Sequence, residues 1–302
     1  MSEAAVVLDG VSKRFTDIVA VDNLSLTVPS GVVYGILGPN GAGKTTTIRM
    51  LVGILRPDRG TLRILGNADP AAIKGRLGYL PEEKGLYKKM RVLELVVYFG
   101  RLKGMTRTAA YTRGRQLLDE FDLGDRHNER CESLSKGMGQ KVQIVATLIH
   151  EPELIVLDEP FSGLDPVNVE LVRSMVLSLR QRNRTVLLST HVMEQAEQIC
   201  DGLILINHGR KLLDGSLTEI RRTARRTISI DYDGDGACQR ELPGVVRVND
   251  AGRHAELSLQ PSADPQMILA CLVNHLTILR FDTREASLHE VFIRAVGDDS
   301  GR

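Results

Sequence analysis

The sequence predicts an α/β protein, in which a mostly parallel sheet carries a helical insertion and is followed by a small α+β domain. Short apolar runs alternate with helical periodicity up to about residue 90 and again over 134–206, the pattern of a parallel sheet with helices on its faces. Few strand signals lie between these parts, and strands dominate beyond residue 220. We therefore expect a first domain over residues 1–220, with a helical subdomain at about 91–150, and an accessory domain over 221–302.

The first strands and the first helix are predicted in order. From Val6 to Val28 the pattern is strand-like, and Leu24, Leu26 and Val28 alternate with polar residues at the two-residue period of a half-buried strand. Val32–Leu37 is a short apolar run between turn residues, which suits a buried parallel strand. Thr45–Leu55 has apolar residues at i, i+3, i+4 and i+7, the spacing of one helix face. A strand, a glycine-rich loop and a helix therefore follow one another directly.

The later elements rest on the same two periodicities. Strands are predicted at 61–65, 77–80, 154–157, 185–189 and 203–206, and helices at 92–102, 108–121, 139–149, 167–180 and 193–200. In the accessory domain the predicted strands are 227–232, 245–248, 256–259 and 276–281, and the predicted helices are 264–275 and 287–296. The arginine-rich segment 217–226 between the domains is interpreted as a solvated linker or helix surface, with a surface for anionic lipid as the alternative.

The composition is that of an ordinary globular protein. Of the 302 residues, 42% are hydrophobic and 25% are charged, which argues against a disordered or coiled-coil chain. Lys and Arg number 39 and Asp and Glu 38, so the net charge of 39 − 38 = +1 offers no general attraction to a nucleic acid backbone. The chain has no Trp and few other aromatic residues on which single strands could stack. We expect no nucleic acid partner.

Cysteine usage and hydropathy predict a location inside the cell. The four cysteines Cys131, Cys200, Cys238 and Cys271 include no close pair that could chelate zinc or form a redox dithiol, so we expect free thiols. The first residues lack the basic and apolar regions of a secretory signal. The longest wholly apolar runs, such as Leu154–Leu157, have four residues, whereas a spanning helix needs about 20. We expect a cytoplasmic chain that does not itself cross a membrane.

The glycine-rich loop after the predicted strand 32–37 matches the phosphate-binding pattern G-x-x-x-x-G-K-[ST] in full. Its residues are Gly38, Pro39, Asn40, Gly41, Ala42, Gly43, Lys44 and Thr45. Glycines let backbone N–H groups close around phosphate oxygens, and the helix N-terminus that follows adds positive potential. Lys44 is placed to neutralise the β and γ phosphates of a nucleotide, and the Thr45 hydroxyl to reach Mg²⁺. We expect a nucleotide site here, with a plain glycine turn as the alternative.

Two carboxylates follow the apolar run Leu154–Leu157. A strand delivers Asp158 to its carboxyl edge, where open α/β sheets place their ligands. Asp158 can then hold the Mg²⁺ shell while Glu159 accepts a proton from attacking water. For this pair alone a solvated strand end is the alternative, and the phosphate loop argues against it.

Three further segments resemble motifs of the ATP-binding cassette (ABC) ATPases. Leu134–Met138 reads Leu-Ser-Lys-Gly-Met and resembles the signature segment, 20 to 24 residues before Asp158. Ser162–Asp165 resembles the D-loop, and Ser189–His191 ends in a residue similar to the switch histidine of the family. Order and spacing agree with the family over roughly residues 5–220. The resemblance implies a P-loop NTPase fold of the ABC type.

The resemblance also implies a role for each matching residue. Phe15 would stack on adenine, and Ser135 and Gly137 would reach the γ-phosphate of a nucleotide held by a second ATPase subunit. The implied sets are Phe15, Thr46, Ser135, Gly137 and Asp165 for nucleotide binding besides the loop, Lys44, Glu159 and His191 for catalysis, and Thr45, Asp158 and Glu82 for the metal. Taken alone, Phe15 would more often be a core residue and His191 a structural hydrogen-bonding residue.

The sequence departs from the commonest family pattern in two segments. In the signature segment, Lys136 stands where glycine is usual and Met138 where glutamine is usual. The glutamine expected after the predicted strand 77–80 is replaced by Glu82. A carboxylate can ligate Mg²⁺ through oxygen, yet it cannot donate a hydrogen bond when ionised. Either Glu82 or its neighbour Glu83 is therefore the candidate replacement.

Three segments resemble a narrower group, the ATP-binding subunits of bacterial ABC-2 type exporters, which include sodium-extrusion and drug-export systems. They are residues 80–87, residues 135–138 and the C-terminal stretch 287–293. The resemblance implies an Mg-dependent ATPase that binds ATP at the inner face of the membrane, as a homodimer or heterodimer of ATPase subunits on a separate membrane-spanning permease. The sequence names neither the transported substrate nor the role of the accessory domain. The alternatives are an ABC ATPase acting on nucleic acid or ribosomes, and a regulatory module with a degenerate site.

Overall fold

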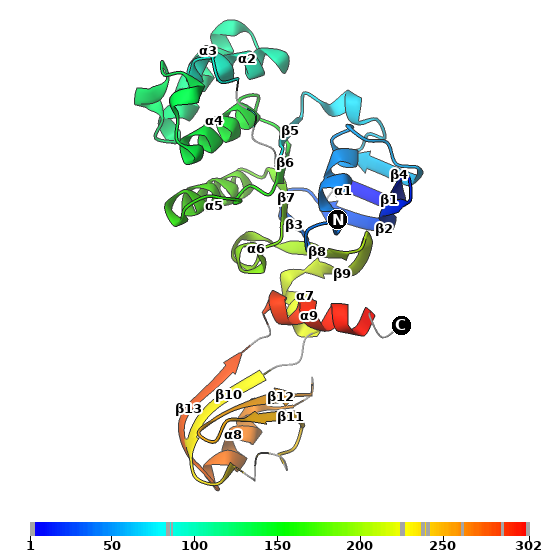
Figure 1. The fold of residues 1–302 in the computed structure, drawn as a ribbon, viewed down its shortest axis with the longest axis vertical. Helices are drawn as coiled ribbons and strands as arrows, with labels where there is room; N and C mark the ends of the chain where they lie inside the picture. The colour runs from blue at the N-terminus through cyan, green and yellow to red at the C-terminus, as the bar shows by residue number, and fades with distance from the viewer. Residues whose placement is uncertain are drawn as a thin grey trace. The chain divides into compact units, whose positions relative to one another are not determined.

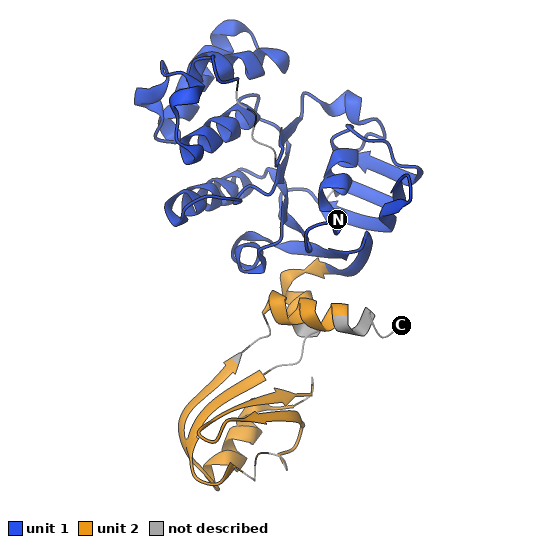
Figure 2. Ribbon diagram, viewed as in Figure 1, with its two compact units in different colours: residues 1–214 blue, residues 215–302 orange. Residues whose placement is uncertain are grey.

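The chain divides into two compact units, residues 1–214 and residues 215–302 (Figure 2). The computed structural model describes residues 4–82, 85, 87–223, 227–236, 239, 242–260, 263–284 and 287–299. The sequence alone placed the domain boundary after residue 220, and the compact first unit ends at Asp214.

The first unit is built on a six-stranded sheet (Figure 1). The strands run in the order β5 (Leu77–Leu80), β6 (Leu154–Asp158), β7 (Thr185–Thr190), β3 (Val33–Leu37), β8 (Gly202–Asn207) and β9 (Arg210–Ser216). Pairing from β5 through to β8 is parallel. Every residue of β3, β6, β7 and β8 is buried, as expected of central strands covered on both faces. The predicted α/β class is confirmed.

The first unit also contains an antiparallel sheet, and helix α1 (Lys44–Leu51) packs between it and the parallel sheet. The strands of the antiparallel sheet lie in the order β2 (Ile18–Pro29), β1 (Ala4–Phe15) and β4 (Arg59–Ile64). Ile48, Met50 and Leu51 of α1 belong to one apolar core with residues of both sheets, and Figure 1 shows α1 between them. Sequence periodicity predicts strands here, but it does not predict that they form a sheet separate from the parallel one.

The helical insertion contains α2 (Val92–Leu102), α3 (Arg107–Glu120) and α4 (Lys136–Leu148), with short 3₁₀ turns at Gly124–Arg126 and Cys131–Ser133. Two glycines let α2 and α3 approach closely. A Cβ on Gly100 would lie 3.0 Å from the Cβ of Ala110, and one on Gly114 would lie 3.1 Å from Val96 Cγ1. The predicted helical character of this segment is therefore reproduced by helices that pack on one another.

Helices α5 (Pro166–Gln181) and α6 (Met193–Ile199) cover the face of the parallel sheet opposite α1 (Figure 1). Asp165 begins α5, because its side chain accepts a hydrogen bond from the backbone N–H of Asn168 at 3.0 Å and Pro166 follows at the first helical position. This cap fixes where the segment 162–165 ends.

The second unit has its own sheet and core. Its strands run in the order β11 (Val245–Asp250), β12 (His254–Leu259), β10 (Thr227–Asp233) and β13 (Thr277–Arg284), with α8 (Pro265–Val273) packed on them. Helices α7 (Leu217–Thr223) and α9 (Leu288–Asp299) contact each other. Part of the segment interpreted as a solvated linker or helix surface is helix α7, while Arg225 and Arg226 lie outside the described residues.

Residue His150, just after α4, joins the insertion to the sheet. Its Nε2 lies 3.0 Å from the carbonyl oxygen of Leu77 and so carries a proton, while Nδ1 is buried without a hydrogen-bond partner among the described residues. Burial lowers the pKa of His150 from 6.5 to about 4, with Leu77 opposing and Lys103 adding to the shift. The protonated form would leave a second N–H buried and unpaired.

Stability should therefore fall as the pH drops from about 6.5 to 4, because the unfolded chain binds the His150 proton more readily in that window. With a discount for partial exposure, the loss attributable to His150 is about 2 kcal/mol. In His150→Gln the side-chain amide can still donate to Leu77, so urea unfolding at pH 7.5 and pH 4.5 should show a smaller difference than in the parent. If the free energy of unfolding changed equally between the two pH values in both proteins, the pH dependence could not be assigned to His150.

Candidate nucleotide site

The loop between β3 and α1 needs glycine at two positions. A Cβ on Gly38 would overlap the carbonyl oxygen of Ile206 in β8, and one on Gly43 would overlap the carbonyl oxygen of Ala20 in β2. Gly43 also has φ of 104°, a conformation that L side chains rarely adopt. The close approach of neighbouring strands therefore accounts for the glycines that the phosphate-binding pattern contains.

Backbone hydrogen bonds shape the loop before any ligand is bound. The N–H of Ala42 donates to Pro39 O at 3.2 Å, and the N–H of Gly209 donates to Ala42 O at 2.9 Å. Gly43 at the N-cap has no side chain to cap α1, and the first turn of α1 has no acidic residue. The amide groups at the start of α1, where Thr45 and Thr46 lie half-buried, can therefore bind an anion.

Lys44 is only 6% exposed, and its ammonium group folds back onto the loop. It donates to Gly38 O at 2.8 Å and to Pro39 O at 3.2 Å, and it lies 3.4 Å from Glu159 Oε1. Carbonyl oxygens hold the ammonium group in place but neutralise little of its charge. A phosphate group entering the loop would meet a buried cation that is already oriented.

Asp158 stands at the carboxyl end of β6, opposite Ser189 of β7 in the strand register. The Ser189 hydroxyl donates to Asp158 Oδ1 at 2.5 Å, and the hydroxyl group of Thr45 lies 3.4 Å from the same oxygen. Asp158 Oδ2 is buried and has no hydrogen-bond partner among the described residues. Burial raises the pKa of Asp158, hydrogen bonds from Ser189 and Thr45 oppose this shift, and the carboxylates of Glu82 and Glu159 add to it.

These oxygens fit a hard divalent cation. The Thr45 hydroxyl and the unpaired Asp158 Oδ2 are oxygen ligands of the kind that Mg²⁺ prefers, and a cation would relieve the buried charge of Asp158. Within the described ranges no group of three His, Cys, Asp or Glu side chains could hold a metal by itself. This agrees with the way Mg²⁺ is usually bound, by one or two carboxylates together with nucleotide phosphates.

Glu159 is held between two other candidate residues. Its Oε1 faces Lys44, and its Oε2 lies 3.0 Å from Nδ1 of His191, the residue just after β7. Glu159 is 6% exposed and has φ of 48°, a strained conformation for a residue other than glycine. The Ser189 hydroxyl fixes this backbone by accepting a hydrogen bond from the Glu159 N–H at 3.0 Å. The arrangement presents a carboxylate that can accept a proton next to the phosphate loop.

Ser189 is a site residue that sequence analysis did not single out. It is fully buried, donates a hydrogen bond to the Asp158 carboxylate and accepts one from the backbone N–H of Glu159. Its position could have been found from the strand register alone, because it lies opposite Asp158 in the neighbouring strand. The sequence gives the two strands but not their alignment.

Ser135, Gly137 and Asp165 lie at the starts of two other helices. Ser135 caps α4 by accepting a hydrogen bond from the Met138 N–H at 3.3 Å, and Asp165 caps α5. Among the residues that the structure describes, no hydrogen bond or ion pair joins these three to the loop 38–45. The structure of one chain therefore does not bring the two sets of predicted site residues together.

Phe15 and Glu82 lie at the edge of the candidate nucleotide site. Phe15 ends β1, is 43% exposed and has the Lys13 ammonium group 5.7 Å from its ring centroid. Strand β2, its hairpin partner, contacts the phosphate loop where Ala20 meets Gly43. Glu82 is exposed and close enough to Asp158 to raise its pKa. Glu83 lies outside the described residues.

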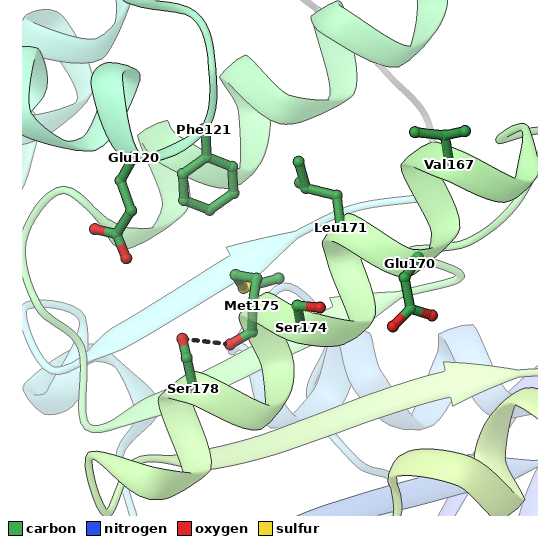
Figure 3. A pocket seen from close by; sticks show the side chains of 8 residues that line it. All are labelled: Glu120, Phe121, Val167, Glu170, Leu171, Ser174, Met175 and Ser178. Atoms are coloured by element: carbon green, nitrogen blue, oxygen red, sulfur yellow. Dashed lines mark hydrogen bonds between the residues drawn. The ribbon is translucent and has the colours of Figure 1, made fainter.

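A groove of about 630 Å³ between the end of α3 and helix α5 contains none of these residues (Figure 3). Phe121, Leu171 and Met175 give it an apolar wall, and the hydroxyl group of Ser178 donates to the carbonyl oxygen of Met175. Its two carboxylates, Glu120 and Glu170, are paired with Arg182 and Arg173, and no residue of the loop 38–45 lines it.

Comparisons with known proteins agree with this geometry. Residues 21–162 match the family model "ABC transporter", and residues 215–296 match "ATP-binding protein DrrA1-3-like, C-terminal domain". The ABC transporter ATP-binding protein YhaQ of Bacillus subtilis is 40% identical over 96% of this chain and 98% of its own length. The daunorubicin/doxorubicin resistance ATP-binding protein DrrA of Streptomyces peucetius is 33% identical, over 97% of this chain and 92% of its own.

Further relatives extend the comparison. Nod factor export ATP-binding protein I of Burkholderia lata is 35% identical over 98% of both chains. A solved ATP-binding subunit of an ABC transporter superposes with a TM-score of 0.67 at 32% identity, covering 72% of this chain and 92% of that one. In the described part of the chain, no helix has the length and hydropathy to span a bilayer. The chain belongs to the ABC transporter ATP-binding family, whose members are nucleotide-binding ATPases.

Proposed function

We propose that this chain is the ATP-hydrolysing subunit of a bacterial export transporter. The observation that carries the proposal is the placing of Glu159, which lies between Lys44 of the phosphate loop and His191, next to the unpaired oxygen of Asp158. The export assignment is supported by relatives that match along almost their whole length, two of which are named for drug resistance and Nod factor export.

Nucleotide binding falls to the phosphate loop. The backbone amides of the loop and Lys44 would hold the β and γ phosphates of ATP, with Thr46 adding a contact in the first turn of α1. Thr45 and Asp158 would hold Mg²⁺, with Glu82 as a third candidate ligand. Magnesium bound there supplies charge neutralisation of the two terminal phosphates. Phe15, exposed on the hairpin that contacts the loop, would stack on adenine.

Glu159 is the proposed general base. Its carboxylate would accept the proton of the water that attacks the γ-phosphate, and the hydrogen bond that its backbone N–H donates to Ser189 holds it in position. His191 orients the carboxylate through its 3.0 Å contact and is exposed enough to contact the γ-phosphate. Lys44 would release Glu159 when phosphate becomes its partner.

Ser135, Gly137 and Asp165 are proposed to act on the nucleotide of a second ATPase subunit. Support comes from their position at the starts of α4 and α5, where no hydrogen bond or ion pair between described residues joins them to the loop of their own chain. Each subunit of a homodimer or heterodimer would then supply half of each site. ATP would hold two subunits together, and hydrolysis would let them separate and drive a membrane-spanning permease. The chain would then lie in the cytoplasm, at the inner face of the membrane.

The test is affinity purification of the tagged protein from detergent-solubilised native membranes, followed by mass spectrometry. A multi-span membrane protein in stoichiometric amount, together with Mg-dependent ATP hydrolysis, is the expected result. Ribosomal or DNA-binding proteins as the main partners would overturn the export assignment in favour of an ABC ATPase acting on nucleic acid. Absence of any Mg-dependent hydrolysis would overturn the catalytic assignment and favour a regulatory module.

A further inference from the structure

Two glycines in different segments each make room for a side chain of the other segment. Gly137 is the second residue of α4, and a Cβ there would lie 2.6 Å from Nδ2 of Asn168. Gly163 lies in the segment before α5, and a Cβ there would overlap Nζ of Lys136. Lys136 is the residue that stands where glycine is usual in the ABC signature segment. The two contacts are reciprocal, so the segments 135–137 and 162–168 interlock.

One partner side chain of this interlock, that of Asn168, is itself held in place. The backbone N–H of Asn168 donates to Asp165 Oδ1 at 3.0 Å, and its Nδ2 donates to Asp165 Oδ2 at 2.5 Å. One turn further along α4, the buried amide of Gln140 donates to the carbonyl oxygen of Pro160. Three contacts, at Lys136, Gly137 and Gln140, therefore join the start of α4 to the segment that leads into α5.

We propose that Lys136 is a positioning residue, which fixes the segment 162–165 relative to Ser135 and Gly137 so that both are presented to the second subunit as one body. The inference rests on the proposed function, because only a shared site gives this alignment a role in hydrolysis. The ammonium group of Lys136 packs against the backbone of Gly163. Gly163 has φ of +67° and no Cβ, and this leaves space for the ammonium group. In the same way, the side-chain amide of Asn168 packs against the backbone of Gly137, which also lacks a Cβ.

Nucleotide binding and assembly of the shared site would depend on different parts of the chain. Nucleotide binding by one subunit depends on the loop 38–45, which Lys136 does not contact in the described structure. Assembly of the shared site depends on the alignment of Ser135 and Gly137 with the segment 162–165. Loss of Lys136 should therefore lower kcat and leave the affinity of the single subunit for ATP unchanged.

Steady-state ATP hydrolysis by the full-length protein is the first measurement. From the usual coupling between contacting residues, Lys136→Ala should lower kcat by about tenfold. Lys136→Arg, which restores a cation on a long side chain, should recover most of the activity. Lys141→Ala, five residues further along the same helix and therefore on a different side of it from Lys136, is the matched control and should behave as the parent. Binding of a fluorescent ATP analogue to the monomer should be equal in all four proteins.

A double-mutant cycle tests the contact itself. Gly163→Ala strains the backbone in any background, but it overlaps the ammonium group only when Lys136 is present. The kcat lost on Gly163→Ala should therefore be larger in the parent than in Lys136→Ala. Additive losses, unchanged kcat in Lys136→Ala, or a parallel loss of nucleotide binding would overturn the proposal. A parent protein that neither hydrolyses ATP nor dimerises with it would instead overturn the proposed function, and this inference with it.

Discussion

Glu159→Gln is expected to lower ATP hydrolysis by roughly 10²- to 10⁴-fold, the range typical of a removed general base. The amide has nearly the same shape as the carboxylate, so the contacts that position residue 159 should persist, including the 3.0 Å hydrogen bond from its backbone N–H to Ser189. What it loses is the ability to accept the proton of attacking water. Single-turnover hydrolysis of radiolabelled ATP measures this step directly.

The same variant should also accumulate as an ATP-bound dimer, because binding remains while the step that separates the subunits is blocked. Light scattering at saturating Mg·ATP would detect it. Glu153→Gln serves as the control, since Glu153 is a partly exposed carboxylate paired with Arg76 and takes no part in the site. A Glu159→Gln protein that stays monomeric would rule out the shared-site mechanism, and one with undiminished turnover would rule out Glu159 as the base.

Lys44→Met should weaken ATP binding by roughly 10- to 150-fold, because it removes hydrogen bonds between a cation and phosphate worth about 1.5–3 kcal/mol. The apolar chain fills similar space but leaves the loop without its buried ammonium group, which now lies 2.8 Å from Gly38 O. Hydrolysis should fall at least as much, since in the proposed mechanism Lys44 would also face the transferred phosphate. Isothermal titration of the nucleotide into the Glu159→Gln background isolates the binding effect.

A lysine elsewhere in the same unit provides the comparison. Lys74 is exposed and distant from the loop in sequence, so Lys74→Met should bind ATP as the parent does. If Lys44→Met bound ATP with parental affinity, phosphate recognition would have to be assigned to the backbone amides of the loop alone.

Local sequence patterns predicted the phosphate loop and its flanking elements well, because strand, loop and helix are neighbours along the chain. The one clear difference is the end of α1, which periodicity extends to Leu55 and the structure ends at Leu51. Gly53, with φ of +74°, follows directly and breaks the helix. Beyond it Leu55 still packs against the core without helical geometry, whereas Ile54 is exposed.

Long-range pairing is what the sequence could not provide. Asp158 was identified from its place after an apolar run, but the hydroxyl that holds it comes from Ser189, 31 positions later, and depends on the register of β6 with β7. The same holds for the antiparallel sheet, whose strands were predicted while their separation from the parallel sheet was not. Residues within a recognisable motif could be named as candidates in advance, whereas residues whose contacts depend on strand register could not.

The position of β3 at the middle of its sheet also has a consequence for biosynthesis. Its hydrogen-bonded neighbours are β7 and β8, and the pairing of Val33 with Val186 spans 186 − 33 = 153 residues. At typical translation rates of 5–20 residues per second, roughly 8–30 s separate the synthesis of the two strands. The antiparallel sheet closes over much shorter loops and can form first. A nascent chain should therefore acquire nucleotide binding late, after most of the first unit has left the ribosome.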